Sequence, residues 1–321
     1  MTRRGFLNGI AAAAATTAAP WRAAPPQPSI PIIDAHIHLF DPTRPQGAPY
    51  SGPPGVPTTP ALPDRYRKLA MPLGIVGAVK VEASPWIEDN LWVLEVAQRD
   101  PIVVGVIGNL EPEKPEFPEY LERYRKNPLF RGIRCGNLWG RNLAAQVSSP
   151  AFIRGLELLA QADLVMDTAN PNVPLLDAIV RLTDKVGRLR VVIDHLPSLE
   201  PPEAAAERSA YDKLLRELAQ RPQIYVKLSA IIHRVNNRVA TDLKTHRPRL
   251  DALMDTFGED RVIFGSDWPN SDGVAPIEAI VGIAKEYFAT KPVAVAEKYF
   301  WRNSAAAYKW IKRHPSQPGV A

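Results

Sequence analysis

The chain alternates eight times between a short apolar run and a helix-like segment, and this repeat limits how it can fold. Runs that are apolar throughout are typical of parallel strands covered on both faces. The predicted strands cover residues 32–38, 74–82, 102–107, 130–135, 163–168, 190–195, 224–229 and 261–267. The predicted helices cover residues 64–70, 86–99, 117–126, 150–162, 173–186, 211–220, 249–257 and 276–289.

Eight such units in 321 residues predict one α/β domain, a closed (β/α)₈ TIM barrel. The alternative is an open doubly wound sheet, which usually has fewer strands and a glycine-rich first turn. No G-x-G-x-x-G pattern follows the first run, so the barrel is favoured. We place the barrel at residues 29–314 and a flexible tail at residues 315–321.

Residues 1–28 have the features of an export signal and its lead-in. Arg3 and Arg4 are followed by Phe6 and Leu7 and then by a weakly apolar, alanine-rich stretch up to Ala19. This twin-arginine pattern predicts a signal peptide for a folded protein, and therefore a periplasmic location. A disordered basic start is the alternative.

Charge and cysteine content exclude several classes of protein. The net charge is +5, and it is +2 without Arg3, Arg4 and Arg22 of the predicted signal, so nucleic acid is not an expected partner. The single cysteine, Cys135, excludes an intrachain disulfide. No apolar run of about 18 residues follows the N-terminus, so no membrane-spanning helix is expected.

Two histidines end the first predicted strand. His36 and His38 lie two positions apart, so on a strand their side chains project to the same side. Buried imidazoles need partners for both ring nitrogens, and a shared metal ion or a substrate oxygen would provide one. The alternative is that backbone carbonyls satisfy both rings. The residues from 40 to 63, rich in proline and glycine, could fold over this pair, with Arg44 and Tyr50 as contacts.

Polar side chains also end, or closely follow, six of the other predicted strands. In barrels of this kind the chemistry lies where the strands end, at one mouth. We therefore expect His36 and His38 to meet residues from the other strands there, whereas His246 and His314 are expected at the surface. The predicted mouth residues are Glu82, Arg134, Asp167, His195, Ser229, His233 and Asp267.

This set can be used in two ways. His36, His38, His195 and Asp267 suit one divalent metal such as zinc, which would leave a position open for water. Without a metal, the histidines could donate hydrogen bonds to an oxyanion. In both cases Asp267 would be the general base. As an isolated motif, Asp267 could instead be a turn residue.

Three further residues are predicted to contact the substrate. Arg134 ends its strand and offers a planar guanidinium to a carboxylate or a hydroxyl group. Its alternative is a salt bridge to Asp167 or Glu82. Glu82 and His233 are predicted as polar contacts from neighbouring strand ends.

The chain resembles the amidohydrolase superfamily, and within it the lactonase-like branch that includes 2-pyrone-dicarboxylate lactonase and sugar-acid lactonases. The matching motifs lie at residues 33–40, 81–85, 130–134, 192–196, 226–229, 263–269 and 301–308, so they span nearly the whole predicted barrel in order. The resemblance implies a distorted TIM barrel. It also implies His36, His38 and His195 around a carbonyl or a metal, Asp267 as the base, and Arg134 as a substrate contact.

One feature departs from the superfamily members with two metals. No lysine or glutamate ends the fourth strand to bridge a metal pair, so one metal or none is expected. We predict an exported hydrolase that opens a lactone, or a related carboxylic ester, of a small polar or anionic substrate, and a homo-oligomer is compatible with the sequence. The alternatives are a metal-dependent decarboxylase of the same superfamily and an inactive, exported ligand-binding barrel.

Overall fold

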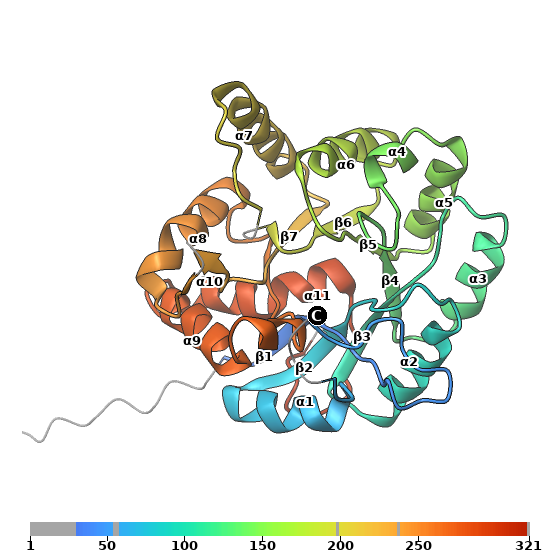
Figure 1. Ribbon diagram of the computed structural model, residues 1–321, viewed down its shortest axis with the longest axis horizontal. Helices are drawn as coiled ribbons and strands as arrows, with labels where there is room; N and C mark the ends of the chain where they lie inside the picture. The colour runs from blue at the N-terminus through green and yellow to red at the C-terminus, as the bar shows by residue number, and fades with distance from the viewer. Residues whose placement is uncertain (1–29, 54–57, 197–198, 236–237, 320–321) are drawn as a thin grey trace, which may run out of the picture.

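The computed structural model describes residues 30–53, 58–196, 199–235 and 238–319, so the predicted signal at 1–28 lies outside the described residues. Eight parallel strands form one sheet in chain order, which confirms the predicted (β/α)₈ barrel (Figure 1). The strands are β1 (Ile32–Ile37), β2 (Ile75–Lys80), β3 (Val103–Gly108), β4 (Phe130–Arg134), β5 (Val165–Asp167), β6 (Arg190–Ile193), β7 (Ile224–Leu228) and β10 (Val262–Phe264).

Helices surround the sheet, and several begin where a side chain caps the first turn. Ser149, Asn172 and Asp242 each accept a hydrogen bond from the backbone amide three residues later. The α-helices are α1 (Pro63–Ala70), α2 (Asp89–Arg99), α3 (Phe117–Tyr124), α4 (Leu143–Gln146), α5 (Pro150–Gln161), α6 (Val173–Lys185), α7 (Ala205–Ala219), α8 (Leu243–Phe257), α9 (Ile277–Phe288), α10 (Val293–Glu297) and α11 (Asn303–Tyr308). Short 3₁₀ turns cover Met71–Leu73 and Asn270–Gly273, and a π-helical turn covers Lys298–Arg302.

The apolar residues divide into two cores. The larger one lies between the sheet and the surrounding helices. The smaller one fills the barrel interior with side chains such as Ile33, Val79, Val104 and Ile263, all fully buried. The interior is therefore a packed core rather than a pore, and the free space lies at the strand ends.

The C-terminal segment closes the end of the barrel opposite the mouth. The Arg131 and Arg190 guanidinium groups donate to the carbonyls of Tyr308 and Ala307 in α11, at 3.0 and 2.8 Å. Residues 315–319 of the predicted flexible tail lie among the described residues. Gln317 is 1% exposed, and its amide nitrogen donates to the carbonyls of Val76 and Pro101.

One departure of the secondary structure from the sequence prediction lies in the segment after β7. A short hairpin of β8 (Arg234–Val235) and β9 (Arg238–Val239) was not predicted, because two-residue strands leave no periodic pattern. α8 begins at Leu243 rather than 249, since Asp242 caps it and Pro248 is accommodated inside it. Within the described residues, no helix is both long and apolar enough to cross a membrane.

Candidate active site

The two histidines of the first strand meet at the mouth of the barrel, as their spacing predicts. The Nε2 atoms of His36 and His38 lie 3.2 Å apart, and both side chains are almost fully buried. His38 Nδ1 lies 3.0 Å from the carbonyl oxygen of Val81, the residue that directly follows the neighbouring strand β2. A carbonyl only accepts, so Nδ1 carries the proton and Nε2 keeps its lone pair toward the mouth.

Asp267, which follows the adjoining last strand β10, and His195, which follows β6, complete this cluster. Asp267 Oδ1 lies 3.2 Å from His38 Nε2, 3.6 Å from His36 Nε2 and 3.8 Å from His195 Nε2. Asp267 and His195 both have left-handed backbone conformations, with φ of 62° and 51°. Such conformations are costly for residues other than glycine, about 1–3 kcal/mol each, and they occur preferentially at functional sites. Here they turn both side chains back over the strand ends.

The protonation states of these residues follow from burial and charge. Burial lowers the pKa of His36 well below its usual value, and the nearby positive charge of Lys227 lowers it further. Burial also lowers the pKa of His195. Burial alone would raise the pKa of Asp267, but the interactions with His195, His38 and His36 outweigh it and hold that pKa well below its usual value. These shifts favour the ionised form of Asp267 and the neutral forms of His36 and His195.

A buried charge network lies directly beneath the cluster. Lys227 is fully buried, and its Nζ lies 2.6 Å from Asp167 Oδ2, 2.9 Å from Asp194 Oδ1 and 3.3 Å from His36 Nδ1. Tyr308 donates its hydroxyl to the same Asp167 oxygen at 3.0 Å. Burial raises the pKa of Asp167 to about 7, whereas Lys227 and His36 hold the pKa of Asp194 below its usual value in spite of burial. Lys227 thus places one positive charge between two buried aspartates under His36, and Arg134 Nη1 lies 3.7 Å from Asp194 Oδ2 as a second positive partner.

Arg134 lies beside the cluster, and its direction is fixed by Glu82. Its Nε donates to Glu82 Oε2 at 3.0 Å, and Glu82 also accepts from the Trp139 indole at 2.7 Å and from the Ser84 amide at 2.8 Å. Glu82 is only 1% exposed and does not line the mouth cavity, so it orients Arg134. Arg134 therefore forms the salt bridge to Glu82 that was the alternative, and it also lines the cavity, as expected of a substrate contact.

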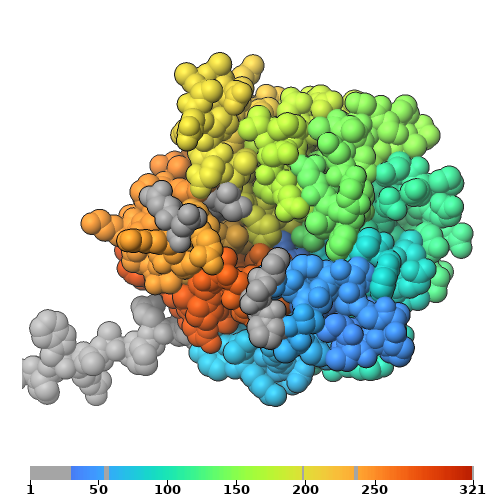
Figure 2. All heavy atoms as spheres, viewed as in Figure 1, coloured from blue at the N-terminus to red at the C-terminus, as the bar shows by residue number. Residues whose placement is uncertain are grey.

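The cavity above the cluster has a volume of about 200 Å³. The segment after β1 contributes to its wall, and in Figure 2 the blue residues of this segment border the hollow at the centre of the face. Tyr50 of this segment donates a hydrogen bond to Asn270, and Asn270 donates to Asp267 Oδ1 at 3.2 Å. The lining residues are His38, Tyr50, Ala83, Arg134, Leu138, Trp139, Ala169, Asn170, His195, Asp267 and Asn270.

Two histidines lie elsewhere than the sequence predicts. His233 is not among the cavity residues; its Nε2 lies 3.2 Å from Arg249 Nη1, and its Nδ1 lies 3.0 Å from the Ile231 carbonyl oxygen. His246, expected at the surface, is 2% exposed and lies 2.7 Å from the Ala240 carbonyl oxygen. Both cases arise because the chain beyond β7 folds away from the mouth into the β8–β9 hairpin and α8.

Several residues near the cluster were not predicted from sequence. Asn170, Asn270 and Trp139 come from loops beyond the strand ends, where no periodic pattern indicates direction. Asp194 could have been found, because it directly precedes His195 at the end of the sixth predicted strand.

The donor atoms of the cluster fit a metal ion. Four ligands about 2.1 Å from one zinc ion in a tetrahedron lie roughly 3.4 Å from one another. Three measured distances are close to this value: 3.2 Å between His36 and His38, 3.2 Å between His38 and Asp267, and 3.6 Å between His36 and Asp267. His36, His38 and Asp267 form one group able to hold an ion, and His36, Asp194 and His195 form a second that shares His36. The site can therefore hold a metal.

A parallel barrel with histidines and an aspartate at its mouth defines a class of α/β barrel enzymes whose chemistry lies at the strand ends. The amidohydrolase family model matches residues 33–310. The chain therefore belongs to the amidohydrolase family, and it is a hydrolase of the lactonase-like kind that the sequence predicts.

Individual relatives agree with this assignment. The chain is 30% identical to the L-fucono-1,5-lactonase of Burkholderia ambifaria over 247 residues, which cover 74% of this chain and 80% of that protein. Its fold is similar to that of a Burkholderia multivorans amidohydrolase crystallised with bound zinc, with a TM-score of 0.75 and 23% identity over 88% of this chain and all of the other. A second crystal structure, of a putative 2-pyrone-4,6-dicarboxylic acid hydrolase from Pseudomonas putida, has a TM-score of 0.71 and 20% identity over 88% of this chain and 98% of the other.

Proposed function

We propose that the protein hydrolyses the lactone of a single sugar acid, with Asp267 as the base that activates water. The observation that carries this proposal is the convergence of three imidazole nitrogens on Asp267 Oδ1, all within 3.8 Å, at the floor of the mouth cavity. The lactonase activity of the Burkholderia ambifaria relative supports the choice of bond.

His36, His38, His195 and Asp267 would hold one divalent cation, and we propose zinc. When bound, such an ion polarises a carbonyl and lowers the pKa of a coordinated water molecule. The lone pair on His38 Nε2, fixed by the contact of its Nδ1 with the Val81 carbonyl oxygen, supports this proposal. So does the zinc in the Burkholderia multivorans structure.

The proton follows a short path. Asp267, held ionised by its neighbours, accepts a proton from the attacking water while the water oxygen bonds to the lactone carbonyl carbon. The bond from this carbon to the ring oxygen then breaks. Asp267 returns its proton to the ring oxygen, which becomes a hydroxyl group. The products of the ring opening are a hydroxyl group and a carboxylic acid on one molecule.

The size and charge of the cavity favour a small polar ring. About 200 Å³ lies below the roughly 300–1,000 Å³ that is usual for pockets of drug-sized ligands. Arg134, oriented by Glu82, offers a guanidinium to the carboxylate that forms, and Asn170 offers its side-chain amide to a hydroxyl group.

The test is a panel of aldonolactones with acid release followed in a pH-stat. We expect ring opening by the wild type, and a loss of about 10²–10⁴-fold in kcat for Asp267→Asn, as for removal of a general base. His314→Ala, which removes an exposed histidine far from the mouth, is the matched control and should keep full activity. Release of CO₂ from aromatic acids with no lactone opened would instead support the decarboxylase alternative.

We further propose that residues 1–28 export the protein to the periplasm. Arg3 and Arg4 support this proposal, because paired arginines ahead of an apolar stretch are recognised by the route for folded proteins. Cell fractionation should find the wild type in the periplasm and the Arg3→Lys, Arg4→Lys variant in the cytoplasm. An unchanged distribution between the two would contradict it.

A further inference from the structure

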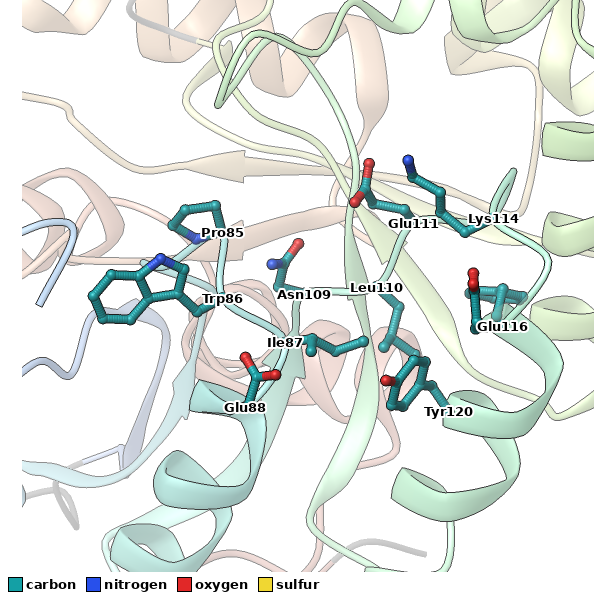
Figure 3. Close-up of a pocket in the computed structure, with 11 residues that line it drawn as sticks. Pro85, Trp86, Ile87, Glu88, Asn109, Leu110, Glu111, Lys114, Glu116 and Tyr120 are labelled. Atoms are coloured by element: carbon teal, nitrogen blue, oxygen red, sulfur yellow. The ribbon is translucent and has the colours of Figure 1, made fainter. Parts of the chain in front are cut away.

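A second cavity lies on the rim of the mouth, between the segments that follow β2 and β3 (Figure 3). Its volume is about 490 Å³, within the range of small-molecule sites. Figure 3 shows Trp86 at one side of this rim cavity, Lys114, Glu116 and Tyr120 at the other, and Asn109 between them. Nothing in the proposed chemistry uses these residues.

Asn109 is a rigid, buried donor directed into the rim cavity. It is 6% exposed, and its Oδ1 accepts a hydrogen bond from Arg141 at 3.0 Å. Arginine only donates, so the atom facing Arg141 must be the oxygen, which fixes the orientation of the amide. The Asn90 side chain forms two hydrogen bonds of 2.9 Å with the Asn109 backbone: it donates to the carbonyl oxygen and accepts from the amide. Across the described residues, the Asn109 Nδ2 group has no hydrogen-bond acceptor.

The charges around the rim cavity are also unpaired. Glu88, Glu111 and Glu116 supply three carboxylates and Lys114 one ammonium group. None of the four forms a salt bridge with any residue in the described part of the chain. The cavity therefore carries a net charge of about −2 and rejects anions, whereas its carboxylates can accept hydrogen bonds from hydroxyl or amino groups.

The aromatic side chains supply a flat surface. Trp86 is 40% exposed, which is unusual for the largest apolar side chain, and Tyr120 is partly buried across the cavity. The face of an indole is electron-rich and attracts the weakly positive C–H groups of a saturated ring. An aromatic face, carboxylate acceptors and one amide donor together match a ring that carries C–H groups on one side and hydroxyl groups around its edge.

We propose that the rim cavity is a second saccharide-binding site, which takes one neutral or amino-bearing sugar ring. It adjoins the catalytic cavity through two short stretches of chain. In one stretch, Ala83 lines the catalytic cavity and Trp86 lines the rim cavity. In the other, Trp139 lines the catalytic cavity, and Arg141 donates a hydrogen bond to Asn109 in the rim cavity. The rim cavity thus holds a sugar beside the reacting lactone. The placement beside a lactone rests on the proposed function, whereas sugar binding in the rim cavity does not.

Binding can be measured without turnover. Titration calorimetry and ligand-observed NMR on the purified protein would use cellobiose as a neutral probe, chitosan disaccharide as a cationic one and digalacturonate as an anionic one. We expect the neutral or the cationic disaccharide to bind with a Kd on the order of 1 mM, and digalacturonate to bind more weakly than either. Trp86→Ala should weaken the binding of these disaccharides at least tenfold. Glu111→Gln should weaken the binding of chitosan disaccharide more than that of the other two probes.

Two controls separate this site from the catalytic cavity. Met71→Ala removes an exposed apolar side chain elsewhere, and it should bind as the wild type does. Asp267→Asn should abolish lactone opening but leave disaccharide binding unchanged. The proposal is overturned if neither cellobiose nor chitosan disaccharide binds up to about 20 mM, if digalacturonate binds most tightly, if Trp86→Ala binds as the wild type does, or if Asp267→Asn abolishes binding.

Discussion

The carboxylate of Asp34 accepts a hydrogen bond from the backbone amide of Ser266, at 2.9 Å, across the seam where the first strand meets the last. The same oxygen accepts from the His36 amide at 3.1 Å, and the other oxygen accepts from the Tyr66 hydroxyl at 2.7 Å. Asp34 thereby closes the barrel with a side chain. Just beyond it, the amide of Asp267 donates to the His36 carbonyl at 2.9 Å, which places the proposed base beside the histidine pair.

Asp34→Ala should therefore affect both stability and the site. Loss of three hydrogen bonds to one buried carboxylate is expected to lower the free energy of unfolding by about 3 kcal/mol, measured by urea denaturation. Asp34→Asn keeps an acceptor toward the seam and should recover most of this loss. Equal stability of the two variants would show that the carboxylate does not hold the seam.

Lys227 is the next residue whose removal should be costly. Lys227→Met leaves Asp167 buried without its positive partner and Asp194 with Arg134 alone, at 3.7 Å, and removal of one partner of a buried ion pair typically costs about 3–5 kcal/mol of stability. Combining it with Asp167→Asn removes one of the two carboxylates, so the double variant should be more stable than Lys227→Met alone. Urea midpoints of the two variants and of Lys227→Arg test this, and a Lys227→Met midpoint equal to the wild type would contradict it.

The sequence predicted the barrel because its strands are buried on both faces. Runs such as 102–107 carry no alternation, and the eight repeats leave little choice of architecture. The sequence could not predict the closure of the opposite end by Gln317, because its burial depends on the carbonyls of Val76 and Pro101 from distant parts of the chain.

The candidate site was predictable where its residues end strands. His36, His38, His195 and Asp267 do so, and the structure brings them together. His233 follows its strand too, but a loop intervenes and turns it away. Asn270 lies in a turn, so its contact with Asp267 depends on loop geometry that no local pattern encodes.

Asn270 should position Asp267. Asn270→Ala removes the 3.2 Å hydrogen bond to Oδ1, and we expect kcat on a lactone substrate to fall about tenfold, the equivalent of one such bond, with little change in KM. Tyr50→Phe removes the bond from Tyr50 to Asn270 and should reduce kcat less, since it acts through Asn270. Steady-state kinetics of both variants and of the double variant test the order. If Tyr50→Phe costs more than Asn270→Ala, Tyr50 contacts the substrate instead.

Lys80 should make the protein more stable as the pH rises. This lysine is 4% exposed, no carboxylate of the described residues lies within 4 Å of it, and burial lowers its pKa to about 8 in spite of attraction to Glu82. The unfolded chain, with a lysine pKa near 10.4, binds the proton more tightly, so the free energy of unfolding should increase between about pH 8 and pH 10. Lys80→Met removes the free-energy penalty of burying a charged lysine.

We expect Lys80→Met to be more stable than the wild type at pH 7, by on the order of 1–3 kcal/mol, and this difference in the free energy of unfolding should shrink by pH 10. Lys68→Met, which replaces a lysine whose side chain is 79% exposed, should show no such trend. Urea denaturation at pH 7, 9 and 10 measures both variants, and a Lys80→Met variant less stable than the wild type at pH 7 would show that attraction to Glu82 and Asp89 outweighs burial.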